Sequence, residues 1–312
     1  DGWARRKLDL SELATDPQPQ RGQIFPIEGR VVRIDVRRPE PEIVRLYDMP
    51  EYYGCEFVLA GSEQPAVVFT RTIPAAWKAG GTMDQRAGAM GFFLKLGSED
   101  AKRPIPIFAA RRVAWYPAGP LGDLRCDAGL LDDVQDNKKL RQEEREAFYQ
   151  MLSAVRRAKP GQLRREADKQ IAKIKAEGTP EQIKAKIDAD TGNHSVAPLF
   201  REPANCRGEL VVVTGNARKV VLIRVDDPDI RSRFGIDHYY EVSIVTLDSQ
   251  GHPLVFCVPD LPEGMPAGDR LNYAETVRVA GFFLKTWAYR VPPPPEAPKT
   301  EAETKIWKKQ DR

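Results

Sequence analysis

A concentration of basic side chains lies in the middle of this sequence of 312 residues, and such groups could bind phosphates. Between residues 137 and 178 there are 12 Lys or Arg and six Asp or Glu, a net charge of +6. The whole chain carries +3, so the remainder totals +3 minus +6, or −3. The candidates for contact with an anionic partner are Arg156, Arg157, Arg164 and Arg165.

The same segment also has apolar residues at helical spacing. Leu140, Phe148 and Met151 fall on one face of a predicted helix, and Leu163 and Ile171 begin the pattern again after a Pro-Gly break. These helices must therefore bury one side, and their basic residues would be solvated on the other. The solvated face is the favoured interpretation, and contact with phosphate or an anionic surface is the alternative.

Aromatic side chains are the second set of candidates, because exposed rings on a β-barrel can stack on nucleic-acid bases. A Tyr-Tyr pair occurs at Tyr52-Tyr53 and again at Tyr239-Tyr240. Neighbouring residues of a strand point to opposite faces, so one ring of each pair is expected to face outward. Core or interdomain packing is the favoured role of these rings. The candidates for ligand contact are Tyr53, Tyr240 and Trp287, together with Lys95 and Lys285 beside the Phe pairs.

Catalytic residues are not indicated by any motif. His194, His238 and His252 have neither the spacing of metal ligands nor a neighbouring nucleophile. No glycine loop for phosphate is present. The sequence therefore predicts a protein that is not an enzyme and has no cofactor and no metal. An enzyme with a cleft between two domains is the weakest hypothesis, because a site built from scattered residues leaves no local motif.

Four cysteines are too few and too scattered for a disulfide scaffold. Cys55 and Cys257 lie in apolar runs that predict buried free thiols. Cys126 and Cys206 bracket the central segment and would pair only in an oxidising compartment.

One strand-rich stretch occurs twice in the chain. Residues 52–95 repeat the order of residues 239–285: a Tyr-Tyr pair, a hairpin, a Pro-containing segment and a final GFFLK. The separation between matched residues is nearly constant, at 187 for Tyr52 and Tyr239, 188 for Pro65 and Pro253, 188 for Pro74 and Pro262, and 190 for Gly91 and Gly281. We therefore predict two copies of one β-rich module.

Each copy is expected to hold five strands, of which the first is long and contains a glycine, Gly29 or Gly215, that would permit a bulge or sharp coil. The order of three strands, a connector and two strands is that of an oligonucleotide/oligosaccharide-binding (OB) barrel. The predicted fold is mainly β, with two OB-like five-stranded barrels in tandem separated by two or three helices. A generic five- or six-stranded barrel or sandwich fits nearly as well.

The GFFLK sequence at residues 91–95 and 281–285 resembles the strand motif of uncharacterised bacterial proteins with tandem OB-like repeats. The resemblance covers both modules and the helices between them, and it implies no known activity.

A capping-box order at Thr179-Pro180-Glu181-Gln182 predicts the start of a third helix. The predicted parts are an N-terminal arm or short helix at 1–20, a barrel at 21–120, a basic helical connector at 121–200, and a second barrel at 201–312 with a Pro-rich segment at 292–298 and a closing strand near 300–308.

No apolar run approaches the ~18 residues of a membrane span. The chain starts at Asp1 without a signal-peptide pattern, which suggests a removed leader or an excerpt of a longer protein. A location in a bacterial cell envelope or periplasm is favoured over the cytoplasm.

We expect a non-enzymatic interaction or scaffold protein that binds a protein or surface partner through barrel loops and the connector. The alternative is a binder of single-stranded nucleic acid or polysaccharide that uses the outward aromatics.

Overall fold

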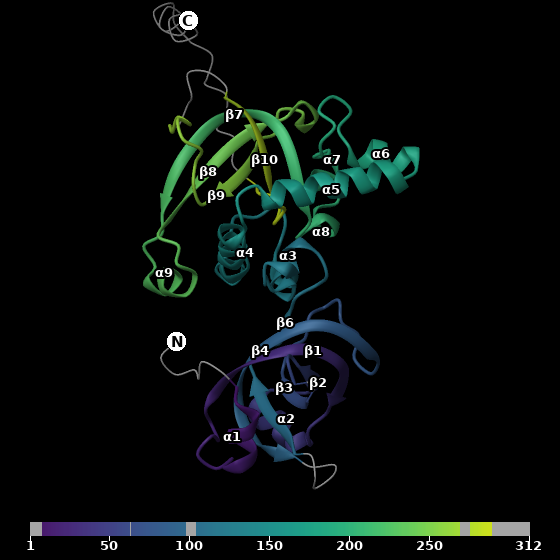
Figure 1. Cartoon of the computed structure of the whole chain (residues 1–312), viewed down its shortest axis with the longest axis vertical. Helices are drawn as coiled ribbons and strands as arrows, with labels where there is room; N and C mark the ends of the chain where they lie inside the picture. Colours follow the sequence, from purple (N-terminus) through teal and green to yellow (C-terminus); the bar gives the residue numbers. More distant parts are fainter. Residues whose placement is uncertain (1–7, 63, 98–103, 269–274, 289–312) are drawn as a thin grey trace, which may run out of the picture.

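Two β-sheets lie one after the other along the long axis of the molecule, and most of the helices lie beside the second sheet (Figure 1). The computed structural model describes residues 8–62, 64–97, 104–268 and 275–288. Strand accounts for 34% and helix for 30%, so the fold is mainly β with a helical connector, as expected. The predicted Pro-rich segment at 292–298 and closing strand near 300–308 lie outside the described residues.

The first sheet closes on itself. Its order is β1-β2-β3-β5-β4-β6, and β1 pairs with β4 as well as with β2. β3 and β5 are parallel, while the other ladders are antiparallel. The core inside this sheet includes Ile27, Phe57, Phe93 and Phe108, all of them fully buried. The strands are β1 (Ile24–Arg37), β2 (Tyr52–Leu59), β3 (Pro65–Thr70), β4 (Thr82–Gly97), β5 (Ile105–Ala110) and β6 (Ala114–Trp115).

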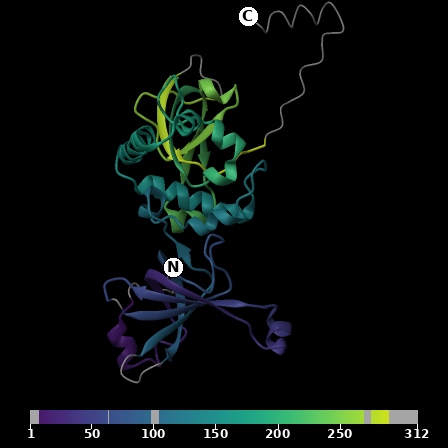
Figure 2. The same ribbon diagram turned by 90° about the vertical axis from the view of Figure 1, so that its right-hand side faces the viewer.

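Two short helices belong to this first part. The predicted N-terminal arm or helix contains α1 (Leu10–Thr15), whose Leu13 is buried in the core of the sheet. The segment after β1 forms α2 (Pro41–Tyr47), which has no buried residue. Figure 2 shows α2 held away from the sheet at the end of extended β1 and β2.

The second sheet has four strands in the part of the chain that the structure describes, in the order β10-β7-β8-β9. These four strands form an open sheet, whereas the first sheet is closed, and the predicted fifth strand lies outside the described residues. The described second sheet is thus an open sheet and not the five-stranded barrel that the sequence predicted. Its strands are β7 (Leu210–Arg224), β8 (His238–Val245), β9 (Leu254–Val258) and β10 (Glu275–Phe282).

The ladders of the two sheets have the same register. Matched residues differ by 186 between β1 and β7, by 187 between β2 and β8, by 188 between β3 and β9, and by 190 between β4 and β10. One pair from each ladder shows this: Gly29↔Ala87 and Gly215↔Val277, Arg30↔Val58 and Asn216↔Val245, Tyr53↔Thr70 and Tyr240↔Val258.

Gly29 and Gly215 hold matching places in this register, and each is needed for a close approach of the neighbouring strand. A Cβ atom at Gly29 would lie 2.1 Å from the carbonyl oxygen of Val58, and one at Gly215 would lie 2.6 Å from that of Val245. The predicted bulge follows two residues after each glycine, at Val31/Arg33 and at Ala217/Lys219.

The connector contains more helices than the two or three that the sequence predicted, and its long helices pack on the second sheet. These long helices bury three of the residues that the 3.6-residue period predicted, Met151, Leu163 and Ile171. Phe148 is only half-buried, and Leu140 lies before the helix in irregular structure. The capping box at Thr179 is present at the start of the third helix. The helices are α3 (Pro120–Asp123), η1 (Ala128–Asp133), η2 (Gln142–Glu144), α4 (Arg145–Arg157), α5 (Gln162–Glu177), α6 (Pro180–Lys186), α7 (Ala197–Arg201) and α8 (Pro203–Cys206), with α9 (Pro228–Phe234) and η3 (Leu247–Ser249) within the second sheet.

Among the helices described, we find none with the length and apolar character that crossing a bilayer requires.

Replacing Gly29 by Ala should lower the free energy of unfolding by about 1–3 kcal/mol, because the added methyl group would overlap a backbone oxygen that cannot move independently. Urea unfolding of the full chain measures this loss. The control is Gly81→Ala, since a Cβ atom at Gly81 meets nothing within 4 Å. Equal stabilities of the two variants would contradict the close-approach explanation.

Candidate interaction surfaces

A buried ion pair joins the connector to the end of the second sheet. The side chain of Glu144, at the start of α4, is 0% exposed, and that of Lys285, three residues after β10, is 4% exposed. Lys285 Nζ donates to both carboxylate oxygens of Glu144, at 2.8 and 3.0 Å. The backbone N–H groups of Arg141 and Gln135 donate to the same carboxylate, at 2.8 and 2.7 Å. All of these donors converge on one acidic group.

Burial alone would raise the pKa of Glu144, because it disfavours the charged form. The hydrogen bond from Lys285 and those from the backbone of Arg141 and Gln135 outweigh burial, and they lower the pKa to about 2. Glu144 is therefore ionised at neutral pH. Lys285, predicted as a ligand contact, is instead occupied by this internal pair.

Neighbouring bonds extend the same junction. Thr286 donates its backbone N–H to Asp136 at 3.0 Å, and Arg207 forms an ion pair with Asp136. Arg207 also donates to the carbonyl oxygen of Leu284 at 3.1 Å. Lys285 and Thr286, after β10, are thus bonded to the segment before α4.

The four predicted arginines have different surroundings. The guanidinium of Arg156 donates to the carbonyl oxygen of Gly235. Arg157 donates to Ser153 Oγ and to the carbonyl oxygen of Leu124, both at 2.7 Å. Arg156 and Arg157 therefore tie α4 to its neighbours.

The other two predicted arginines lie on α5. Arg164 and Arg165 are exposed, and Arg165 donates to the carbonyl oxygen of Pro160 at 3.3 Å. All four predicted arginines are exposed, and Arg156, Arg157 and Arg165 each also donate a hydrogen bond within the chain.

Most of the aromatic side chains that were candidates for ligand contact are packed against the cores. Tyr53 is half-buried against the first core and donates its hydroxyl to Glu51 at 2.8 Å. Tyr240 is half-buried against the core of the second sheet, and the preceding ring, Tyr239, packs on Phe148 of α4 with ring centroids 5.5 Å apart. Trp287 remains exposed.

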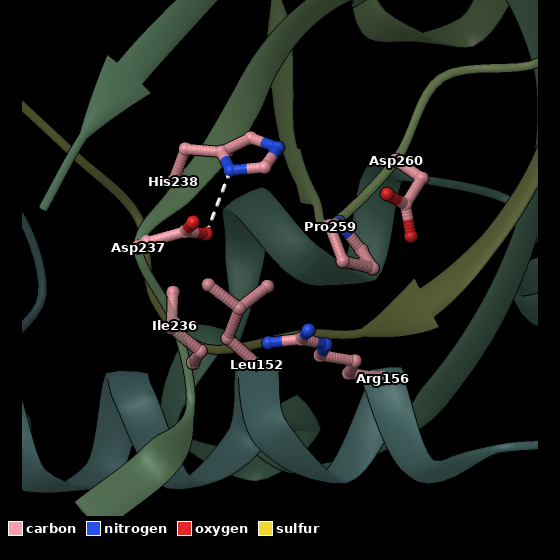
Figure 3. Close-up of a pocket in the computed structure, with 7 residues that line it drawn as sticks. All are labelled: Leu152, Arg156, Ile236, Asp237, His238, Pro259 and Asp260. Carbon is pink, nitrogen blue, oxygen red and sulfur yellow. Dashed lines mark hydrogen bonds and ion pairs between the residues drawn. The ribbon is translucent and has the colours of Figure 1, made fainter. Parts of the chain in front are cut away.

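A small cavity beside Arg156 contains polar side chains but little room (Figure 3). Its volume is about 30 Å³, enough for a water molecule or two. His238 Nδ1 lies 2.8 Å from Asp237 Oδ1 at its edge. The cavity is lined by Leu152, Arg156, Ile236, Asp237, His238, Pro259 and Asp260.

A larger open groove, of about 1090 Å³, lies between the connector helices and the start of β7. Two titratable groups in its wall are neutral at pH 7. Burial lowers the pKa of His194, whose Nδ1 accepts the backbone N–H of Val212 at 3.1 Å. Burial raises the pKa of the Cys206 thiol, and both Cys206 and Cys126 are free cysteines. The conditional pairing of these two cysteines is absent from the structure.

Within residues 8–62, 64–97, 104–268 and 275–288, no three His, Cys, Asp or Glu side chains converge so that they could hold a metal ion.

The outer face of β4 exposes three large apolar side chains at alternate positions. Met90, Phe92 and Leu94 are 51%, 49% and 42% exposed, and Lys95 beside them is exposed as well. The sequence analysis identified Lys95, beside the Phe pair, as a candidate but missed Met90 and Leu94. The signal in the sequence was that this strand is apolar on both faces. A strand with one solvated face would instead alternate apolar and polar residues.

No family model matches the chain, and no curated protein matches it. Among solved structures, the chain is similar to an aspartyl-tRNA synthetase described as putative, from Leishmania major Friedlin, with 9% identity over 77% of this chain and 49% of that chain and a TM-score of 0.22. It is also similar to the aspartyl-tRNA synthetase from Entamoeba histolytica, with 12% identity over 77% and 50% and a TM-score of 0.21. The chain spans about half the length of both structures. Likeness at these TM-scores does not define a shared fold or activity.

Replacing Lys285 by Met should destabilise the protein by about 3–5 kcal/mol, because it leaves the Glu144 carboxylate buried without its cation. The double variant Lys285→Met with Glu144→Gln should regain most of this loss, since it removes both charges. Urea unfolding measures all three proteins. The matched control is Lys95→Met, which changes an exposed lysine and should stay within about 0.5 kcal/mol of wild type. A loss at Lys95 as large as that at Lys285 would refute the assignment.

Acid should weaken the same pair. The pKa of Glu144 falls from its ordinary value of 4.5 to about 2 on folding, so the pair stabilises the protein fully above pH 4.5. That contribution is lost as the pH falls from 4.5 towards 2. Unfolding free energies measured across this range should fall more steeply for wild type than for the double variant. Parallel curves would show that Glu144 does not titrate in this way.

Proposed function

We propose that this chain is a non-enzymatic interaction protein that binds a protein partner on the outer face of β4. The observation that carries the proposal is the exposure of Met90, Phe92 and Leu94 on one side of one strand. Contiguous apolar side chains on a protein surface are typical of interaction sites, whereas single ones are ordinary. Lys95 adds a cation at the end of this apolar row.

The arrangement of the strands supports a scaffold built from two OB-like modules. The first sheet closes in the order β1-β2-β3-β5-β4, with the first and last strands paired, as in a five-stranded Greek-key barrel. The second sheet repeats three of its ladders in the same register. We infer a tandem repeat in which the connector helices cover one face of the second copy.

The alternative, binding of single-stranded nucleic acid or polysaccharide, has less support. Tyr53 and Tyr240 are half-buried against the two cores, which leaves little of each ring for stacking. Lys285 is occupied by Glu144, and Arg157 by the backbone and side chain of its neighbours.

Photo-crosslinking in the cells that make the protein tests the proposal. A photoreactive phenylalanine analogue at position 92 of the full chain should form a covalent adduct with one protein, identified by mass spectrometry. The same analogue at Tyr47, which is 65% exposed on α2, is the control and should give no such adduct. The purified partner should bind wild type, and Phe92→Glu should weaken this binding at least about tenfold, since a charge would enter an apolar contact.

Absence of an adduct at position 92, or the same adducts at positions 92 and 47, would reject the proposed surface. Unchanged affinity of the purified partner for the Phe92→Glu variant would reject it as well.

A further inference from the structure

We infer that the partner presents an amphipathic α-helix to the outer face of β4, with an acidic side chain near the helix N-terminus that pairs with Lys95. This inference rests on the proposed function, because it names the chemistry of the partner at the same surface.

The first step is a comparison of the two sheets. The register of β4 on β1 and of β10 on β7 matches residues of β4 with residues 190 positions later. Gly91 pairs with Phe25 as Gly281 pairs with Val211, which fixes which side of each strand faces the core. The exposed residues Met90, Phe92, Leu94 and Lys95 therefore correspond to Ala280, Phe282, Leu284 and Lys285.

The second step is what covers that face in the second sheet. Ala280 and Phe282 pack against the cluster formed by Leu163, Ala167 and Ile171 of α5. Phe282 and Leu284 pack against a second cluster, which includes Ala147 and Met151 of α4. Two helices of the chain itself thus lie on this face and partly bury it. Figure 1 shows α5 crossing close to β10, with α4 below it.

The third step is the charge. Lys285 is held by Glu144, which immediately precedes α4 and so lies at the N-terminus of the covering helix. Among the described residues, no acidic side chain forms an ion pair with Lys95, and its exposed side chain lies beside Leu94. Within the described residues, the first sheet thus offers a similar apolar row and the corresponding lysine, with neither a covering helix nor a paired carboxylate.

Two further cations flank the row and favour an acidic helix. Arg21 adjoins Gly22, whose backbone N–H donates to the carbonyl oxygen of Phe93 at 2.9 Å. Arg111 follows Ala110, which pairs with Gly91. Both arginines are exposed, and in the part of the chain that the structure describes neither side chain forms an ion pair. Met90 takes the place of the smaller Ala280, so the partner helix should place a small residue opposite it.

The probe is a labelled synthetic peptide of residues 141–177 of this chain, which contains Glu144, α4 and α5 and covers the corresponding face of the second sheet. Fluorescence anisotropy measures its binding to the full-length protein. Phe92→Glu should remove binding, and Lys95→Glu should weaken it about tenfold by replacing an attraction with a repulsion. The peptide variant Glu144→Lys should restore the affinity for the Lys95→Glu protein. The control Arg45→Glu makes the same charge change on exposed α2 and should leave binding unchanged.

Failure of the peptide to bind, or binding that ignores Phe92→Glu, would overturn the helix inference. Loss at Lys95→Glu without recovery by the charge-swapped peptide would overturn the acidic contact. The proposed function would be rejected by a different result, the lack of a photo-adduct at position 92. A partner that crosslinks there through a segment without helix would support the binding surface and reject the helix. A partner whose affinity is unchanged by Lys95→Glu would support the binding surface and reject the acidic contact.

Discussion

The pairing of Lys285 with Glu144 is the interaction on which the arrangement of helices and second sheet depends. Removing both charges from water costs several kcal/mol, and the pair persists because donors surround the carboxylate. Besides Lys285, the backbone N–H groups of Arg141 and Gln135 bind it. The start of α4 is therefore held at one place beside the end of β10. Nearby, Asp136 binds Arg207 and Thr286 and adds a second fixed contact.

Because it is anchored in this way, the connector forms a layer of packed helices and not a flexible linker. Its long helices cover the outer face of β10 through Leu163, Ala167 and Met151. The same connector reaches the first sheet, where buried Asp127 binds Arg112 at 2.9 Å and accepts the backbone N–H of Trp115 at 2.9 Å. In the part of the chain that the structure describes, no helix covers the corresponding face of the first sheet, where Met90, Phe92 and Leu94 are exposed.

Much of the fold followed from local sequence. Strand alternation and the near-constant separation of matched residues predicted the strands, and the same separations recur in the registers of the ladders. The capping box at Thr179 and the break at Gly161 predicted helix ends, because both depend on neighbouring residues only. The candidate site was predicted less well. Met90 and Leu94 were missed, since exposure of an apolar strand residue depends on what packs over it.

The sequence by itself determined most of the described strands, the long connector helices and the correspondence of the two GFFLK segments, because these properties depend on periodicity and spacing along the chain. It could not distinguish Lys95 from Lys285, which stand in the same five-residue sequence. Only the tertiary structure made them different. Glu144, 141 residues away from Lys285, meets that lysine in the folded chain and removes it from solvent, while Lys95 stays exposed. Burial and pairing are properties of contacts between distant segments, and a local motif does not encode them.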